Sequence, residues 1–312
     1  MLEKALAACR HVLGDKDPCT LKAIEDLAEF TVVSKQLDLA LPLHTELLTT
    51  RRETLGEQHP DSIKSMNRLA AVHRLLGDLK SAIELQEKVL ALTRSSLGDT
   101  HPSTCVMMRN LGMLLRDLGA LGRAAALHEE ALEICQETLG ERNASTLICI
   151  SELVEILRER GELEFARSTL GSSASTAREV FGPKHRQTLV LEARAAHIAY
   201  GLSPNDSSVI TELRNVTARM TQSLGVSDQQ TVKYTALLCR LLERQPAAPA
   251  PSTATSIASD RCAQAAVIPS DVLERSKETN RSATSVLQGQ DDPIKSSLSG
   301  EKRRRALAPR RM

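Results

Sequence analysis

Residues 55–92, LGEQHPDSIKSMNRLAAVHRLLGDLKSAIELQEKVLAL, contain the pattern of two amphipathic helices in a row. Pro60 stands at the start of the first helix, where its missing N–H group costs no hydrogen bond, and apolar residues follow at helical spacing. Gly77 and the Asp after it end this helix, and a second apolar series follows. Gly98 closes the second helix, at a place typical of a left-handed cap.

The same pattern recurs along the chain at a nearly constant interval. The closing glycines follow one another at 42, 42, 42, 42 and 43 residues: Gly14, Gly56, Gly98, Gly140, Gly182 and Gly225. A Ser or Thr comes six residues after each Gly: Thr20, Ser62, Thr104, Thr146, Thr188 and Thr231. A Leu comes thirteen residues after four of them: Leu27, Leu69, Leu111 and Leu153. An Ala comes 26 residues after the same four: Ala40, Ala82, Ala124 and Ala166. One such hairpin cannot bury its apolar face alone, whereas stacked neighbours can, so the sequence predicts an all-α solenoid.

The composition agrees with a helical fold. Aromatic residues make up only 2% of the chain and Trp is absent, which argues against β-sandwiches and barrels and against modules that stack nucleic-acid bases. The net charge of +1 gives no global attraction to a nucleic acid or a membrane surface. No apolar run approaches the roughly 18 residues that a membrane-spanning helix needs. We therefore expect neither a membrane nor a nucleic acid as a partner.

The pattern divides the chain into three parts. Residues 1–14 match the end of a second helix, so the sequence begins in mid-repeat, as expected for a fragment, for a truncated gene model or for a chain with a capping partner elsewhere. Residues 15–244 contain five two-helix units and one last helix over 226–244. A Gly-Ser-Ser sequence at 171–173 weakens the second helix of the fourth unit. The fifth unit, with Ser-Pro-Asn at 203–205, is degenerate, as terminal repeats often are.

Residues 245–312 form a tail of different composition, rich in Pro, Ala, Ser and Thr, and we predict that it is mostly disordered. A basic cluster lies near its end: Lys302, Arg303, Arg304 and Arg305. Such a cluster is typical of a nuclear-localisation or polyanion-binding segment, and equally of a solubilising terminus. The expected location is cytoplasmic, with a nuclear location through this cluster as the alternative.

The sequence contains no motif of a catalytic or metal site. His128-Glu129-Glu130 begins like the zinc-binding helix of a metalloprotease, but Leu132 stands where the second His would be. The seven cysteines are scattered, and we interpret them as reduced, mostly buried apolar residues of an intracellular protein. We therefore expect a non-enzymatic chain without a cofactor. The alternative is the regulatory or adaptor portion of a longer signalling enzyme.

The repeat resembles the tetratricopeptide array of kinesin light chains and related proteins such as nephrocystin-3. The shared motif is Leu-Gly-x-x-His-Pro, then Asn-x-Leu-Ala, Gly, Ala and Ala-Leu, and it stands in residues 55–92. It recurs as LGDTHPSTCVMMRNLGMLLRDLGALGRAAALHEEALEI, residues 97–134. The resemblance covers about residues 1–244. It implies a right-handed superhelical solenoid of helix-turn-helix repeats that acts as a protein-interaction scaffold or adaptor.

Two details of the motif bear on partners and ligands. Kinesin light chains join the motor heavy chain through a heptad coiled coil ahead of the array. No such segment is found in this sequence, so we do not expect the kinesin heavy chain as a partner. The motif's histidines, His59 and His101, precede helix starts, and we interpret them as local helix caps rather than as ligands.

The resemblance also implies a binding groove. The first helix of each unit usually lines the concave surface of such arrays, and the family's grooves clamp acidic peptides with Asn and basic side chains. The corresponding positions give seven candidates: Lys64, Asn67, Arg74, Arg109, Met113, Arg116 and Arg158. Arg is suited to binding a carboxylate through two hydrogen bonds, and Met adapts its shape to an anchor side chain. We therefore predict protein or peptide partners, and the basic groove indicates acidic peptides among them. A second interpretation is an ordinary solvated face, in which Glu155, Asp117 and Glu159 neutralise the basic residues.

Overall fold

The computed structural model describes residues 1–204 and 206–244, which belong to one compact unit, Met1–Pro246. The predicted disordered tail and its basic cluster, 302–305, lie outside the described residues. Regular structure in the described part is entirely helical, which confirms the predicted all-α solenoid. None of the described helices is both long and apolar enough to cross a membrane.

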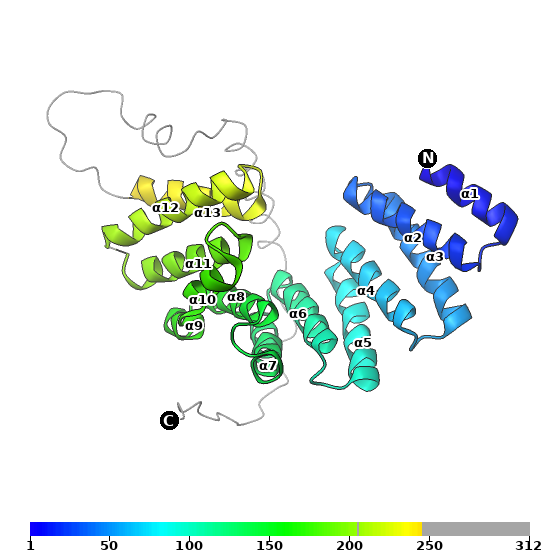
Figure 1. Cartoon of the computed structure of the whole chain (residues 1–312), viewed down its shortest axis with the longest axis horizontal. Helices are drawn as coiled ribbons and strands as arrows, with labels where there is room; N and C mark the ends of the chain where they lie inside the picture. Colours follow the sequence, from blue (N-terminus) through cyan, green and yellow to red (C-terminus); the bar gives the residue numbers. More distant parts are fainter. Residues whose placement is uncertain (205, 245–312) are drawn as a thin grey trace, which may run out of the picture. The chain divides into compact units, whose positions relative to one another are not determined.

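Thirteen helices follow one another in the described part, and sequence neighbours pack side by side along the series (Figure 1). The first helices of the units are α2 (Pro18–Val33), α4 (Pro60–Leu75), α6 (Pro102–Asp117), α8 (Ala144–Glu159), α11 (Arg186–Leu202) and α13 (Gln229–Arg244). The second helices are α1 (Leu2–Leu13), α3 (Leu37–Leu55), α5 (Leu79–Leu97), α7 (Leu121–Leu139), the pair α9 (Leu163–Leu170) and α10 (Ser173–Phe181), and α12 (Ser207–Leu224).

Each first helix begins with a side-chain cap three residues after the closing Gly. His59 Nδ1 accepts a hydrogen bond from the backbone N–H of Asp61 at 3.2 Å. Equivalent contacts are made by the other capping residues: Asp17, His101, Asn143, His185 and Asp228. Such a cap satisfies one of the N–H groups that the first helical turn leaves without a partner. The interpretation of these histidines as local caps is therefore confirmed.

The glycine that closes each second helix adopts a conformation that only glycine tolerates. Gly98 has φ 91° and ψ 164°, and Gly56, Gly140 and Gly182 have almost the same angles. The prediction of a left-handed cap at Gly98 is right in the sign of φ but wrong in ψ, because the left-handed helical value is about 47°. The observed region is essentially closed to residues with a Cβ atom. The extended ψ leaves the glycine carbonyl able to reach the next helix.

That carbonyl accepts a hydrogen bond from the Ser or Thr hydroxyl six residues later, a contact we name the junction bond. The donor–acceptor distances are 2.7 to 2.8 Å for the four junction-bond donors Ser62, Thr104, Thr146 and Thr188. All four donor residues are fully buried. The hydroxyls of Thr20 and Thr231, at the two ends of the series, have no hydrogen-bond partner. The conserved spacing of Gly and Ser/Thr within this chain therefore has a direct physical cause, which is the joining of consecutive units.

The other repeated positions form the core between helices. The four repeated alanines are completely buried, and the four repeated leucines are buried as well. A glycine brings α6 and α7 together in the third unit: a Cβ atom at Gly112 would lie 2.5 Å from His128 Cδ2. His128 is itself fully buried, and burial lowers its pKa to about 4. His128 is therefore a neutral packing residue where α6 and α7 meet.

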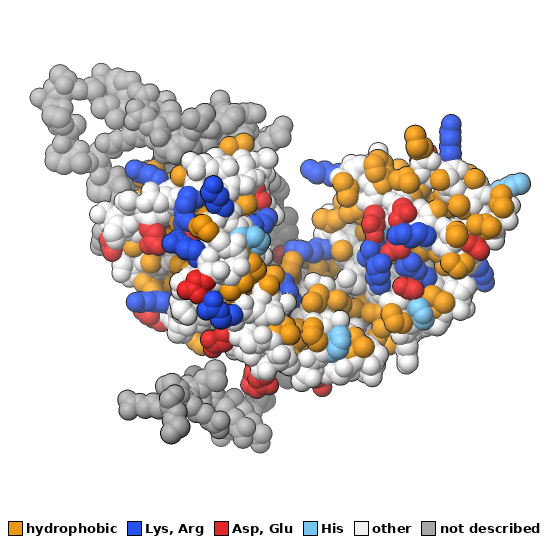
Figure 2. All heavy atoms as spheres, in the orientation of Figure 1, with side chains coloured by type: hydrophobic (Ala, Val, Ile, Leu, Met, Phe, Trp, Pro, Cys, Tyr) orange, Lys and Arg blue, Asp and Glu red, His pale blue; other side chains and the backbone are white. Residues whose placement is uncertain are grey.

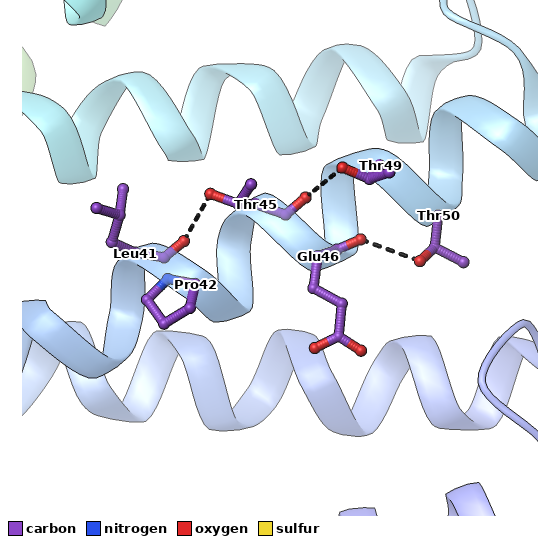
Figure 3. A pocket seen from close by; sticks show the side chains of 6 residues that line it. All are labelled: Leu41, Pro42, Thr45, Glu46, Thr49 and Thr50. Carbon is purple, nitrogen blue, oxygen red and sulfur yellow. Dashed lines mark hydrogen bonds between the residues drawn. The ribbon is translucent and has the colours of Figure 1, made fainter.

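Two local irregularities shape the second helices. The Gly-Ser-Ser sequence divides that of the fourth unit, as the sequence indicates: α9 ends at Leu170, Gly171 has φ 45°, and α10 begins at Ser173. Pro42 lies inside α3, and threonine hydroxyls near it donate to carbonyls four residues earlier, as Thr45 does to Leu41 at 2.8 Å (Figure 3). At the divided helix, α11 packs directly against α8 and α9 as well as α10.

We predict that replacing Thr104 with Val destabilises the protein by about 0.5–1.5 kcal/mol, because the buried Thr104 side chain then no longer donates a hydrogen bond to the Gly98 carbonyl. The matched control is Thr20→Val, which removes a buried hydroxyl that has no partner and is expected to change stability by less than about 0.5 kcal/mol. Urea unfolding followed by circular dichroism measures both. Equal losses in the two variants would contradict a special role for the junction bond.

Candidate functional site

Polar side chains on consecutive first helices contact one another in two rows, which we name the polar ladder. Each contact joins a residue to the one 43 positions later, which is one repeat plus one residue. In one row, Asn110 Nδ2 donates to Asn67 Oδ1 at 3.1 Å, and Arg109 donates to both carboxylate oxygens of Glu152 at 2.6 and 2.7 Å. The other row consists of Arg74–Asp117 and Arg116–Glu159.

The polar ladder brings four of the seven predicted groove residues together on α4, α6 and α8. Arg116 binds Glu159 through two hydrogen bonds at 2.7 and 2.8 Å, and Arg74 Nε donates to Asp117 at 2.6 Å. Met113 lies on α6, between Arg109 and Arg116 in the sequence, and is half-buried. Every basic candidate therefore has a carboxylate partner. The ion pairs that the second interpretation requires, with Asp117, Glu159 and Glu155, are present.

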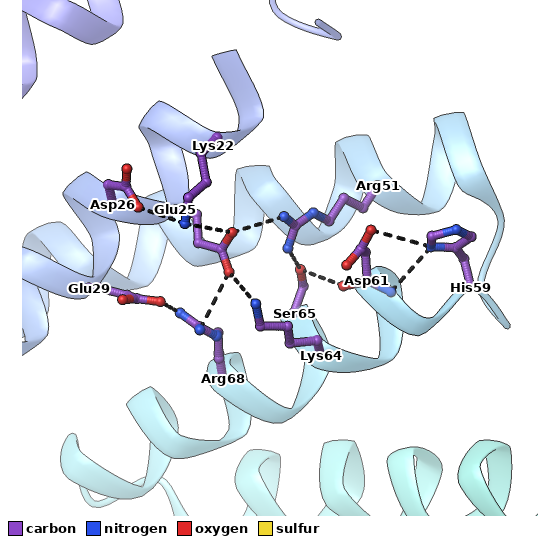
Figure 4. A network of polar contacts seen from close by, with 10 residues as sticks. All are labelled: Lys22, Glu25, Asp26, Glu29, Arg51, His59, Asp61, Lys64, Ser65 and Arg68. Carbon is purple, nitrogen blue, oxygen red and sulfur yellow. Dashed lines mark hydrogen bonds and ion pairs between the residues drawn. The ribbon is translucent and has the colours of Figure 1, made fainter. Parts of the chain in front are cut away.

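Lys64 belongs to a separate cluster around Glu25 of α2 (Figure 4). The Glu25 side chain is only 3% exposed, and its oxygens lie 3.0 Å from Lys64 Nζ and 3.1 Å from Arg51 Nη2. Arg68 also reaches it, at 3.4 Å. Burial alone would raise the pKa of Glu25, but the hydrogen bonds from Lys64 and Arg51 outweigh it and lower the pKa to about 2. One buried carboxylate thus holds three cations from α3 and α4.

Arg158 belongs to a second cluster of the same kind, around Glu155 of α8. Glu155 is completely buried, and its carboxylate lies 2.9 Å from Arg158 Nη2 and 3.2 Å from Arg194 Nε. Lys233 of α13 completes the set of partners. Burial would raise the pKa of Glu155, yet the charges of Arg194, Lys233 and Arg158 hold it well below the usual carboxyl range. Three cations on one carboxylate leave this cluster with a positive surplus.

Sequence analysis named Asp117, Glu155 and Glu159 as carboxylate partners of the groove cations but missed other residues that pair with them. Glu152 of α8, the partner of Arg109, was not predicted, and neither was Arg194 of α11, which continues the same row by donating to the backbone and hydroxyl oxygens of Ser151. The signal that finds such partners is the repeat length plus one, because helices in adjacent units are offset by about one residue. Lys233 carried no comparable signal, since it lies in the last helix after the degenerate unit.

Comparison with known proteins identifies the repeat. Residues 23–95 and 63–137 each match the family model of the tetratricopeptide repeat. Residues 23–137 belong to the tetratricopeptide-repeat family. The matched residues include α4 and α6 and therefore the part of the polar ladder that joins these two helices; the α8 residues of the ladder lie beyond the match. No curated protein matches the sequence.

Solved structures share the fold of the tetratricopeptide-repeat array. One consists of nearly identical TPR-like repeats of a protein assigned as a kinesin light chain from Podosopora anserina, with 22% identity and a TM-score of 0.57. The match covers 65% of this chain and 95% of that one, and a variant of the same protein gives a TM-score of 0.58. The apo form of RapI, at 11% identity, has a TM-score of 0.61 and covers 91% of this chain and 90% of its own. At 11–22% identity, these structures share the fold of the array.

We predict that Glu155→Gln destabilises the array by about 3–5 kcal/mol at pH 7, because three cations then lose their buried counter-charge. The control Glu87→Gln removes an exposed carboxylate, paired with Arg123, and is expected to cost at most about 1 kcal/mol.

The same pair of proteins tests the pH dependence. Because the folded-state pKa of Glu155 is depressed, its stabilisation is complete above the unfolded value of about 4.3 and is lost as the pH falls below it. The difference in unfolding free energy between wild type and Glu155→Gln should therefore narrow on acidification. Denaturant unfolding from pH 7 to pH 3 measures it, and a constant difference would contradict the assignment.

Proposed function

We propose that the tetratricopeptide-repeat array is a non-catalytic protein–protein interaction scaffold that binds acidic peptide segments along α4, α6 and α8. The observation that carries this proposal is the polar ladder, which holds arginine side chains in a contiguous strip in the geometry that suits carboxylates. Arg74 and Arg116 are each about one-third exposed, as are their carboxylate partners. Exposed ion pairs contribute at most about 1 kcal/mol, so a ligand carboxylate can replace the internal partner at low cost.

The surroundings of the polar ladder favour an acidic ligand over a basic one. At the α8 end of the strip, the buried carboxylate of Glu155 faces three cations, whereas at the α2 end the cations around Glu25 also pair with Asp26 and Glu29. Figure 2 shows Lys and Arg side chains lying together with Asp and Glu side chains on this face of the molecule. Apolar contact is available between the charges, since Leu75 and Val106 are exposed on α4 and α6. This combination supports a peptide with acidic residues and an apolar anchor.

The candidates have unequal parts in this proposal. Arg109 is mostly buried and binds Glu152 through two hydrogen bonds, so we assign it to holding α6 against α8. Arg74 and Arg116 are the exchangeable cations, and Met113 is the candidate contact for an apolar anchor. Asn67, bonded to Asn110, still has amide N–H groups to offer to a peptide backbone. Lys64 and Arg158 extend the positive surface at either end.

Selection from a phage-displayed random peptide library tests the proposal on the full chain. We expect the selected peptides to be enriched in Asp and Glu, and their binding to weaken as ionic strength rises. The double variant Arg74→Gln/Arg116→Gln should lose roughly tenfold in affinity for them.

Arg123→Gln is the matched control. Arg123 lies on the second helix α7, pairs with Glu87 at 2.9 Å and has no place in the polar ladder. It should bind the selected peptides as the wild type does. Peptides without acidic enrichment, or full binding by the double variant, would contradict the proposal.

A further inference from the structure

Three buried thiols converge where α6, α7 and α8 meet. Cys105, Cys135 and Cys149 come from these three helices, and none is more than 2% exposed. The Sγ atoms of Cys135 and Cys149 lie 3.7 Å apart, in hydrogen-bonding contact. Their burial agrees with the sequence prediction of core cysteines, but their meeting was not predicted. Two thiols in contact are a potential disulfide as well as core packing.

A small cavity gives this cluster access to small molecules. It has a volume of about 150 Å³ and is lined by Cys105, Cys135 and Arg109 together with Val106, Leu139 and Ser145. One water molecule occupies about 30 Å³ in the liquid, so the space is sufficient for a molecule the size of hydrogen peroxide. Cys149 does not line the cavity. The arrangement therefore presents Cys135 to the cavity and places Cys149 directly behind it.

The contacts around Cys135 favour its thiolate form. The hydrogen bond from Cys149 lowers the pKa of Cys135 below the ordinary cysteine value, and contacts with Cys105 and Arg109 act in the same direction. The same hydrogen bond, together with burial, raises the pKa of Cys149. The thiolate is the nucleophilic form of cysteine. Cys135 is therefore the attacking sulfur and Cys149 the thiol that remains protonated beside it.

We propose that Cys135 and Cys149 form a hydroperoxide-sensitive dithiol that closes to a disulfide between α7 and α8. The Cys135 thiolate attacks one oxygen of hydrogen peroxide, the O–O bond breaks, and hydroxide leaves with the proton that the thiol had released, as water. The sulfenic acid on Cys135 is then attacked by the Cys149 sulfur. The S–S bond forms, the S–O bond breaks, and a second water leaves. The two sulfurs lose two electrons and the peroxide gains them.

The disulfide would lie beside the polar ladder. Arg109 lines the cavity and also binds Glu152 on α8, three residues after Cys149. To form the bond, the two sulfurs must approach from 3.7 Å to about 2.05 Å, which draws α7 and α8 together at this point. Oxidation is therefore expected to act where two units join, next to the residues that hold α6 against α8.

Peptide mapping of the oxidised full chain tests the proposal. Reduced protein is exposed to limiting hydrogen peroxide, unreacted thiols are alkylated in denaturant, and tryptic peptides are analysed by mass spectrometry. Residues 124–142 and 143–158 form separate peptides, each with one of the two cysteines, and residues 95–109 carry Cys105. The exposed Cys19 serves as the internal control. We expect a linked 124–142/143–158 pair that dithiothreitol reverses, formed roughly tenfold faster than Cys19 is oxidised.

Two variants separate the roles of the neighbouring cysteines. In Cys149→Ala, oxidation should stop at a Cys135 sulfenic acid, which dimedone traps when added with denaturant. In Cys105→Ala, the Cys135–Cys149 link should still form. Circular dichroism confirms that both variants remain helical. A link between the peptides of Cys105 and Cys135, no linked pair before Cys19 is oxidised, or no dimedone adduct in Cys149→Ala would overturn the proposal.

Discussion

The boundary between consecutive units depends on one hydrogen bond, from a buried Ser or Thr hydroxyl to the carbonyl of the glycine six residues earlier. The bond requires a glycine with positive φ and extended ψ, a conformation closed to other residues. It also fixes where the first helix of the next unit begins, because the cap lies between the two bonded residues. The Gly, the capping residue and the Ser or Thr hydroxyl of each unit thus all contribute to the same connection between units.

A fixed joint sets the register between neighbouring first helices. Because every unit repeats the same turn, a side chain on one first helix meets the side chain one position later on the next, and the polar ladder follows. The array can then hold buried carboxylates such as Glu25 and Glu155 among several cations contributed by different units. Such clusters tie together helices that are far apart in sequence, including α8 and α13.

Sequence reasoning predicts what depends on spacing within one unit. The helix starts, the capping histidines, the buried alanines and the break at Gly171 all follow from local pattern and are confirmed. The glycine ψ was not predictable, because it depends on a hydroxyl in the following helix. Which carboxylate pairs with a given groove cation depends on the offset between units. The cations that surround Glu155 depend on the degenerate end of the array. The proximity of the three cysteines was not predicted, because they stand at three different positions of the repeat.

Different parts of the array should therefore differ in local stability. The junction bonds lie between α3 and α4, α5 and α6, α7 and α8, and α10 and α11, while α2 and α13 carry threonines without a partner. Native-state hydrogen exchange measures the opening free energy of each helix directly. We expect the highest protection against amide hydrogen exchange in α4 to α8 and a decrease toward α1 and α13. Equal protection along the series, or stronger protection in α1 or α13, would contradict the claim that the junction bond holds consecutive units together.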